Sequence, residues 1–282
     1  MAFTSEPPAV PPELLISFPL PHVLLLTLNR PKQLNAMTPA LQAAIERVLD
    51  WFEDEVSLWA VIVTGKGRAF CAGQDLKMWL ADPTSAPLPS ESSKHGFASI
   101  SRRKSCKPII AAVNGLAMGG GMELIVNCDL VVASEDAKFA LPEVSRGVVA
   151  AQGGIPRLAA ISGHQLASEM LLLGQPISAQ LAHSRFGFVN RVVPASEVLP
   201  TALKLAQTIV NNSPDSVWST KIALVEGRGD IEGYVQRWED NPRGRGFAQS
   251  ENMVEGLRAF QEKRKPDWSN PAAPISAVKA KL

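Results

Sequence analysis

Two glutamates beside turns are the side chains of this sequence best suited to move protons. Glu123 follows three consecutive glycines in the stretch AMGGGMELIV, and Glu143 follows a proline in KFALPEVSRG. Taken singly, each is typical of the first turn of a helix, where the helix dipole favours a carboxylate. Taken together, they could form an acid/base pair that acts on an activated carbonyl group.

Two glycine-containing turns could supply that activation. One lies in GRAFCAGQDLK, residues 67–77, and the other in AMGGGME, residues 117–123. Two backbone N–H groups at such turns can hold a carbonyl oxygen that becomes negative, and glycine lets the substrate approach the peptide plane. Neither turn contains GxxxxGK[ST] or GxGxxG, which argues against a phosphate loop or a dinucleotide site. By itself, a triple glycine before a helix is more often a tight packing turn than a functional one.

These turns must be positioned by an alternation of strands and helices. Short apolar runs bounded by turn residues predict strands at 14–18, 22–29, 58–65, 107–115 and 129–134. A helix is predicted at 38–55, with Thr38 as its N-cap and Pro39 at its first position. Buried strands separated by helices predict an α/β fold with crossover connections. The Pro/Ser-rich stretch 82–96 predicts a loop.

From about residue 160 the pattern changes to successive helices. Helical periodicity predicts them at 163–174, 178–187, 196–212, 214–227 and 246–265. The proline-rich residues 1–13 are predicted to be disordered or extended, and residues 269–282 to form a flexible tail.

The composition argues against several classes of binding partner. Lys plus Arg total 28 against 27 for Asp plus Glu, and this net charge of +1 argues against a nucleic-acid partner. No run approaches about 18 apolar residues, so we expect no membrane span. Three widely spaced cysteines favour reduced thiols. The four histidines are scattered and neither CxxC nor HExxH occurs, so we expect no metal site.

In their order and spacing, the motifs resemble the crotonase (enoyl-CoA hydratase/isomerase) superfamily from about residue 14 to 268. The stretches that carry the resemblance are LNRPKQLNAM, VIVTGKGRAFCAGQDLK, KPIIAAVNGLAMGGGMELIVNCDLVVAS, FALPEVSRG, GGIPRL and EGLRAFQEKRKPDW. The resemblance implies an α/β crotonase-like spiral of ββα units over residues 14–200 and a C-terminal helical trimerisation region over 201–268. It also implies a homo-oligomer, either a trimer or a dimer of trimers.

The resemblance further implies roles for individual residues. The N–H groups of Gln74 and Gly120 would form the oxyanion hole, with Glu123 and Glu143 as the catalytic pair. Residues implied to contact the substrate or its CoA part are Lys32, Arg68, Ala72, Gln74, Asp75, Leu76, Lys77 and Gly120, with Phe260 and Lys263 reaching a neighbouring subunit's CoA. For Lys32 and Arg68, solvated surface charge is an equally good interpretation. Coenzyme A would enter as part of an acyl-CoA thioester substrate, with no separate cofactor.

The implied reaction is addition of water across the 2,3 double bond of a 2-enoyl-CoA. Its rivals are a Δ3,Δ2-enoyl-CoA isomerase and a hydratase of secondary metabolism, such as one for branched, hydroxylated siderophore acyl groups. A non-catalytic crotonase-fold scaffold and an RNA-binding relative belong to other classes. Glu123 favours hydration over isomerisation, because related isomerases commonly retain only the carboxylate equivalent to Glu143. The Gln74 side chain, the stretch GVVAAQGGIPRL and the 82–96 loop depart from the family pattern and leave the acyl preference open.

The last three residues suggest a location. Ala280, Lys281 and Leu282 form a close variant of the S-K-L peroxisomal signal. No N-terminal transit segment is recognisable. We therefore expect the peroxisomal import receptor as a partner and the peroxisome as the location, with the cytoplasm as the alternative if the tail is merely charged and disordered.

Overall fold

The computed structural model describes residues 3–76, 80, 94–227 and 250–271. Lys77, most of the expected 82–96 loop and the C-terminal tripeptide lie outside the described residues.

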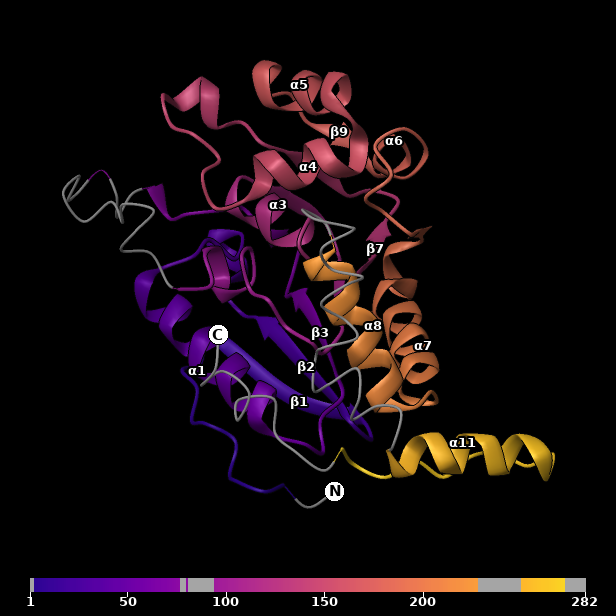
Figure 1. The fold of residues 1–282 in the computed structure, drawn as a ribbon. Coiled ribbons are helices and arrows are strands. Elements are labelled where there is room, and N and C mark those ends of the chain that lie inside the picture. Colours follow the sequence, from indigo (N-terminus) through magenta and orange to yellow (C-terminus); the bar gives the residue numbers. More distant parts are fainter. Residues whose placement is uncertain (1–2, 77–79, 81–93, 228–249, 272–282) are drawn as a thin grey trace.

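The strands form two sheets (Figure 1). The first has the order β1 (Leu14–Leu20), β2 (Val23–Leu28), β3 (Ala60–Gly65), β5 (Ile109–Val113), β7 (Leu130–Ser134) and β10 (Arg191–Val193). The second has the order β4 (Ala69–Cys71), β6 (Leu116–Met118), β8 (Lys138–Ala140) and β9 (Ile177–Ser178). Only the pairs β1–β2 and β8–β9 are antiparallel; the other pairs are parallel.

Successive strand pairs alternate between the two sheets. The chain passes from β3 to β4, from β5 to β6 and from β7 to β8, and each step leaves the first sheet for the second. Parallel neighbours need a crossover between them, so each repeat winds once around the space between the sheets. This confirms the expected α/β spiral.

Helices cover the sheets on both sides (Figure 1). In chain order they are α1 (Pro39–Asp54), α3 (Gly120–Ile125), α4 (Gly154–Ser162), α5 (His164–Leu173), α6 (Ala179–Ser184), α7 (Val198–Val210), α8 (Pro214–Glu226) and α11 (Glu251–Gln261). As predicted, Thr38 caps α1, its hydroxyl accepting from the Leu41 N–H, and Pro39 is the first helical residue. Short 3-10 helices lie at η1 (Pro31–Gln33), η3 (Phe97–Ser99), η4 (Glu143–Arg146) and η5 (Ala195–Glu197).

The helix α7 crosses the expected boundary between core and trimerisation region at residue 200. Val198, Ala202, Ala206 and Val210 recur at four-residue spacing, are buried, and pack with side chains of β2, β3, β5 and β7. The start of the C-terminal region is therefore part of the core around the first sheet. The division into two regions stays a prediction.

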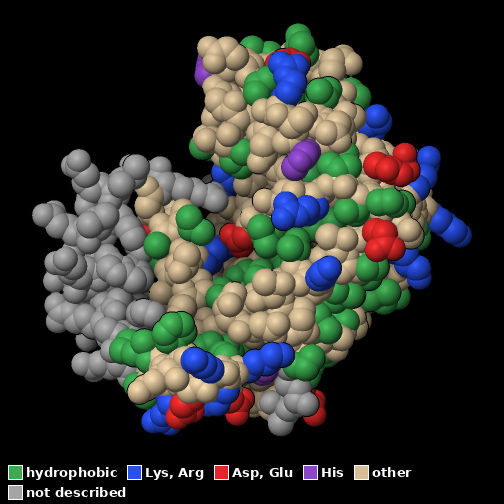
Figure 2. All heavy atoms as spheres, turned by 90° about the vertical axis from the view of Figure 1, so that its right-hand side faces the viewer, with side chains coloured by type: hydrophobic (Ala, Val, Ile, Leu, Met, Phe, Trp, Pro, Cys, Tyr) green, Lys and Arg blue, Asp and Glu red, His purple; other side chains and the backbone are tan. Residues whose placement is uncertain are grey.

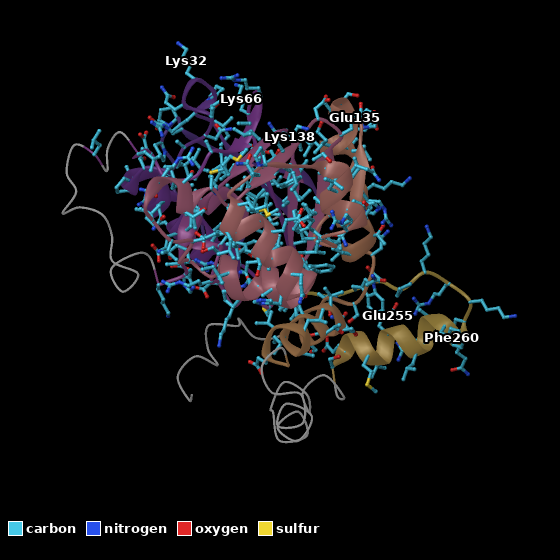
Figure 3. The ribbon with its side chains drawn as sticks, turned by 90° about the horizontal axis from the view of Figure 1, so that it is seen from above. Lys32, Lys66, Glu135, Lys138, Glu255 and Phe260 are labelled. Atoms are coloured by element: carbon cyan, nitrogen blue, oxygen red, sulfur yellow. The ribbon has the colours of Figure 1, made fainter. Side chains whose placement is uncertain are left out.

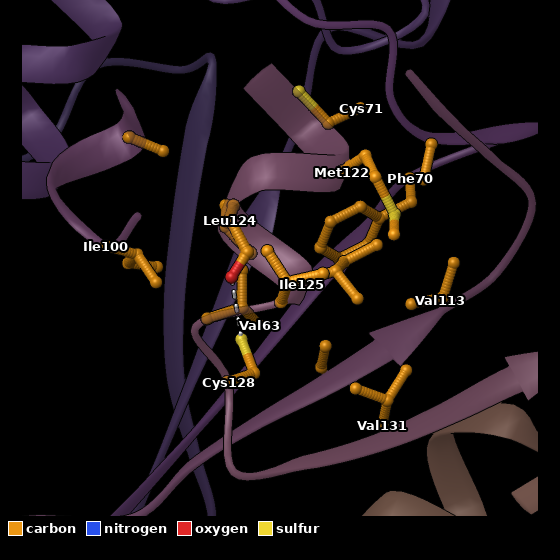
Figure 4. Close-up of a cluster of buried hydrophobic side chains, with 14 of the residues drawn as sticks. Val63, Phe70, Cys71, Ile100, Val113, Met122, Leu124, Ile125, Cys128 and Val131 are labelled. Carbon is orange, nitrogen blue, oxygen red and sulfur yellow. Dashed lines mark hydrogen bonds between the residues drawn. The ribbon is translucent and has the colours of Figure 1, made fainter. Parts of the chain in front are cut away.

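The apolar core places α3 firmly against the sheets. Met122, Leu124 and Ile125 are fully buried among side chains of β3, β4, β5 and β7 (Figure 4). Glu123 lies between Met122 and Leu124, so the burial of these neighbours leaves its side chain little freedom to move.

Residues 3–13, which were expected to be disordered or extended, contact α1 and β1 in the structure. They have no helix and no strand, but Thr4 donates through its N–H and its hydroxyl to Glu55 Oε2, both at 2.7 Å. The Phe3 ring lies 4.7 Å from that of Phe18 and 5.4 Å from that of Trp51. Ordering this segment costs conformational entropy. The two aromatic contacts and the two hydrogen bonds offset that cost.

The helix α11 extends away from the body of the subunit (Figures 1 and 3). Ser250 is the N-cap of α11. Trp268, in the segment that follows α11, packs over Gly256 of the helix. Phe260 projects from its outer end and is 86% exposed (Figure 3).

The surface carries both signs of charge. On the face that bears the C-terminal helices, basic and acidic side chains are interspersed among apolar ones (Figure 2). Within the described residues, no helix is both long and apolar enough to cross a membrane.

Candidate active site

The first turn presents the Gln74 N–H away from its neighbouring strand. Met37 donates to the Gly73 carbonyl at 2.8 Å, and Asp75 donates to the Met37 carbonyl at 3.0 Å. Because backbone groups alternate in direction along an extended segment, the N–H of the intervening Gln74 points to the opposite side. Between described residues, that N–H makes no backbone hydrogen bond.

The second turn lies directly against the first. A Cβ on Gly73 would lie 3.3 Å from the Gly120 nitrogen, so the two turns are in contact. Gly119 has φ +55° and leads into α3, whose first residue is Gly120. The Gly120 N–H likewise makes no backbone hydrogen bond to a described residue. Two adjacent donors without a backbone partner among the described residues can together bind one oxygen atom.

The closeness of the backbones explains the glycines. A Cβ on Gly121 would lie 2.3 Å from the Cys71 carbonyl oxygen, and one on Gly120 would lie 2.3 Å from a Phe97 ring carbon. Any other residue would push the turns apart. The packing interpretation of the triple glycine and the functional one are therefore compatible.

Glu123 is held by two backbone donors. It is 3% exposed, and its Oε1 accepts from the N–H of Gln152 at 2.7 Å and of Gly154 at 3.0 Å. Burial raises its pKa to about 7; the Gly154 and Gln152 N–H groups and Arg157 oppose the rise, and Glu143 adds to it. A carboxyl group with a pKa near neutrality can both release and accept a proton in the cell.

Glu143 begins the 3-10 helix η4, after β8 and Pro142. A Cβ on Gly119 would lie 3.1 Å from Glu143 Oε1, so this carboxyl group borders the second turn. Its Oε2 is buried and has no hydrogen-bond partner among the described residues. Burial also raises the pKa of Glu143, opposed in part by Arg146. A buried carboxyl oxygen left without a partner is available to a bound substrate.

One cavity of about 1140 Å³ brings these groups together. Gln74, Gly120, Glu123 and Glu143 all line it, and much of the remaining wall is apolar, including Phe97, Leu116, Met118, Ala140, Val148 and Val149. Small-molecule sites commonly measure about 300–1,000 Å³. The cavity is therefore large enough for an acyl chain and part of its carrier.

The other residues implied to bind CoA are placed differently. Ala72 and Leu76 line the cavity, whereas Lys32 is exposed in a separate hollow of about 440 Å³ and Arg68 is exposed outside both. The Asp75 carboxylate pairs with Arg30 at 3.3 Å, which ties the first turn to the segment before η1. Phe260 and Lys263 lie on and just after α11, outside this subunit's cavity wall. The roles of these residues in CoA binding stay predictions.

Three contacts of the site were missed by sequence reasoning. They are the N–H groups of Gln152 and Gly154 on Glu123 and the Phe97 ring against Gly120. A backbone donor has no residue-type signature, although the GGIPRL stretch that contains Gly154 was part of the resemblance. Phe97 lies beyond the Pro/Ser-rich stretch, far from any motif.

Comparison with known proteins identifies the family to which this architecture belongs. Residues 21–271 match the family model described as enoyl-CoA hydratase/isomerase. The chain belongs to the enoyl-CoA hydratase/isomerase family. It is 46% identical over 260 residues to the mevalonyl-coenzyme A hydratase sidH of Aspergillus fumigatus, covering 90% of this chain and 94% of the relative. It is 42% identical over 279 residues to the mevalonyl-coenzyme A hydratase SIDH of Beauveria bassiana, covering 96% and 99%.

Solved structures agree. The enoyl-CoA hydratase of Bacillus anthracis superposes with a TM-score of 0.85 at 32% sequence identity, covering 92% of this chain and all 100% of that one. This crotonase-family protein is thus an enzyme, a hydro-lyase of the enoyl-CoA hydratase type that acts on a CoA thioester. The scaffold and RNA-binding alternatives are set aside by these relatives.

Metal ligands are not gathered in the part of the chain that the structure describes. No group of three or more His, Cys, Asp or Glu side chains there could hold a metal ion. The expectation that this family member works without a metal or a separate cofactor stays a prediction.

Proposed function

We propose that this protein catalyses reversible hydration of a 2-enoyl-CoA whose acyl chain is branched at C3 and hydroxylated at C5, with mevalonyl-CoA as the hydrated form. The observation that carries a hydration reaction is the meeting of Glu123 and Glu143 with the Gln74 and Gly120 N–H groups in one cavity. The choice of acyl group is supported by the two mevalonyl-coenzyme A hydratases, which match nearly full length. The general enoyl-CoA hydratase that the motifs suggested first is the second candidate.

The proposed chemistry uses the groups in the cavity directly. The thioester oxygen accepts from the Gln74 and Gly120 N–H groups, which draws electrons from C3 and stabilises the negative charge that develops on the oxygen. The ionised glutamate takes a proton from water as the water oxygen bonds to C3. The protonated glutamate delivers its proton to C2 as the double bond opens. The two carboxyl groups end with exchanged protonation, which raised pKa values at both positions allow near neutral pH.

An isomerase remains the rival reaction within the family. Moving a double bond requires a carboxyl group to transfer a proton between C2 and C4, and one glutamate is enough for that. Here two carboxyl groups line the same cavity, and the second is needed only if water must be activated. This favours hydration.

A substrate panel decides between these candidates. We would measure loss of the ultraviolet absorbance of the conjugated thioester with crotonyl-CoA, longer straight-chain enoyl-CoA and 5-hydroxy-3-methylpent-2-enoyl-CoA, and identify the products. The proposal expects the branched, hydroxylated substrate to have the highest kcat/KM and to yield mevalonyl-CoA. Faster turnover of a straight-chain substrate would return the assignment to a general enoyl-CoA hydratase. Isomerised product without hydration would assign an isomerase.

We also propose that the enzyme is a trimer or a dimer of trimers, in which α11 lies against a neighbouring subunit. Val254, Leu257 and Phe260 are 48%, 62% and 86% exposed and recur every three residues, so they share one face of α11. Because α11 projects from the subunit, its apolar face would be stabilised if a second copy of the chain covered it. Phe260 and Lys263 would then reach the CoA of that copy.

Light scattering tests this assembly. The wild type is expected at the mass of a trimer or hexamer, and Leu257→Asp should shift it to smaller species because a charge would be buried in the interface. Arg258→Asp is the control, since it places the same charge on the same helix at an exposed, already charged position outside the row of Val254, Leu257 and Phe260. A stable, active monomer would contradict the assembly and the shared CoA site.

The tripeptide Ala280-Lys281-Leu282 supports import into the peroxisome, because it resembles a signal that a receptor reads at a free carboxyl terminus. A fluorescent protein fused to the N-terminus leaves that end free. We expect the full-length fusion in peroxisomes and a fusion lacking residues 280–282 in the cytosol. A full-length fusion that stays diffuse would exclude the signal.

A further inference from the structure

The structure shows a closed ring of contacts around Glu123 that contains one hydroxyl group. Ser101 is fully buried, and its Oγ donates to the Gln152 carbonyl at 2.8 Å. The N–H of the same Gln152 donates to Glu123 Oε1 at 2.7 Å. One side chain therefore anchors the residue that orients the glutamate.

The other half of the ring runs through Asn127, four residues after Glu123. Its side-chain amide is buried and donates to the carbonyls of Ile100 at 2.6 Å and Arg103 at 3.1 Å, on either side of Ser101. The segment that carries the hydroxyl is thus attached to the end of α3, the helix that carries Glu123. Glu123 and Asn127, through which the ring closes, therefore lie on or directly after the same helix.

The loop held by Ser101 needs such an anchor. Gly153 has φ +106°, and a Cβ on Gly154 would lie 2.7 Å from Glu123 Cγ, so the backbone here is free of the side-chain constraints that usually fix a loop. Arg157 adds a second anchor through its donation to the Gly153 carbonyl at 3.2 Å. Without an anchor, the two N–H donors would not stay aimed at one carboxylate oxygen.

We propose that Ser101 is a positioning residue for the reaction, which keeps Glu123 Oε1 in the hydrogen bonds of the 152–154 loop and so leaves the other oxygen, Oε2, for water or substrate. This inference rests on the proposed hydration by Glu123. Ser101 touches no reacting atom; it acts through Gln152.

The charges and hydrogen-bond donors around Glu123 determine whether loss of the Ser101 hydroxyl would raise or lower the pKa of Glu123. Glu143 faces it from η4 and disfavours its charge, and Arg157 faces it from α4 and favours it. Arg102 also contacts the loop, since a Cβ on Gly153 would be 3.4 Å from its Cγ. The two N–H groups lower the pKa of Glu123 against the effect of burial. Loosening them must raise that pKa.

The test compares Ser101→Ala with Ser105→Ala. Ser105 is equally deep in the same segment; its Oγ donates to the Lys107 carbonyl at 2.9 Å and accepts from the Lys107 N–H at 3.0 Å, and within the described residues its side chain makes no hydrogen bond to Glu123 or to the 152–154 loop. Ser101→Ala loses one buried hydrogen bond and Ser105→Ala loses two, so the control should melt at a temperature at least as low as that of Ser101→Ala. Only Ser101→Ala is expected to lower kcat/KM, by about 10-fold or more, and to move the Glu123 limb of the pH–rate profile upward by about half a unit or more.

A second readout does not depend on turnover. In a Glu143→Gln background, the Glu123 carboxyl carbon can be titrated by NMR, with and without Ser101→Ala, and assigned by its loss in Glu123→Gln. A raised Glu123 pKa in the Ser101→Ala protein supports the inference even if no enoyl-CoA is hydrated, an outcome that would reject only the proposed function. An unchanged pKa and an unchanged profile shape in Ser101→Ala would overturn it. An equal shift of the Glu123 pKa in the Ser105→Ala protein would also overturn the inference.

Discussion

Replacing either Glu123 or Glu143 by Gln is expected to lower turnover by at least about 100-fold. The amide preserves the size of the side chain but neither takes a proton from water nor delivers one to C2. General acid–base groups typically contribute about 10²–10⁴-fold, and here both carboxyl groups line one cavity beside the two backbone donors. The measurement is kcat for hydration, followed by loss of the enoyl thioester absorbance. Near-wild-type hydration by Glu123→Gln would reject the two-glutamate mechanism and favour isomerisation.

The same variants carry their own control for folding. The folded-state pKa of Glu123, about 7, is above its ordinary value of 4.5, so the folded state binds an extra proton between these pH values. Stability of the wild type therefore falls as pH rises through this window, and the cost is fully present above about pH 7. Gln carries no charge to bury, so Glu123→Gln should melt at a temperature at least as high as the wild type at pH 8. A lower melting temperature there would mean that lost activity reflects damaged structure.

Replacing Gly120 by Val is expected to abolish measurable turnover. A Cβ at this position would lie 2.3 Å from the Phe97 ring, and the branched side chain would occupy the space where the thioester oxygen reaches the Gly120 N–H. Losing one oxyanion donor raises the barrier by about 2.7–4 kcal/mol, or roughly 10²–10³-fold in rate. Steady-state hydration kinetics at saturating substrate measure the loss directly.

Two comparisons separate blocked catalysis from disturbed packing. Gln74→Ala keeps the backbone N–H and should cost less than about 10-fold; damage as large as that of Gly120→Val would assign chemistry to the Gln74 side chain. Gly120→Ala combined with Phe97→Leu relieves the ring contact and should recover thermal stability relative to Gly120→Ala alone. Turnover is not expected to recover, because the added Cβ still obstructs the donor. Full recovery of turnover would show that Gly120 is needed for packing only.

Local pattern predicted most elements and indicated the candidate reacting groups. Apolar runs located β2, β3, β5 and β7, and the Thr38-Pro39 start located α1, because burial and capping are properties of short stretches. Three glycines followed by a glutamate indicated a close approach of backbones at the same place as a carboxylate. The packing of residues 3–13 could not be predicted from local pattern, because it depends on the rings of Phe18 and Trp51, which are distant in sequence.

The arrangement of those groups depends on contacts between distant segments. The Gln74 and Gly120 turns lie close enough to bind one oxygen atom only because the strands that precede them, β4 and β6, are neighbours in the second sheet. The raised pKa of Glu123 follows from burial by α3 packing, and its orientation follows from backbone donors of Gln152 and Gly154. Residue types in the sequence carry the capacity for proton transfer, whereas burial and hydrogen-bond geometry, which set proton affinity and direction, arise only when the chain is folded.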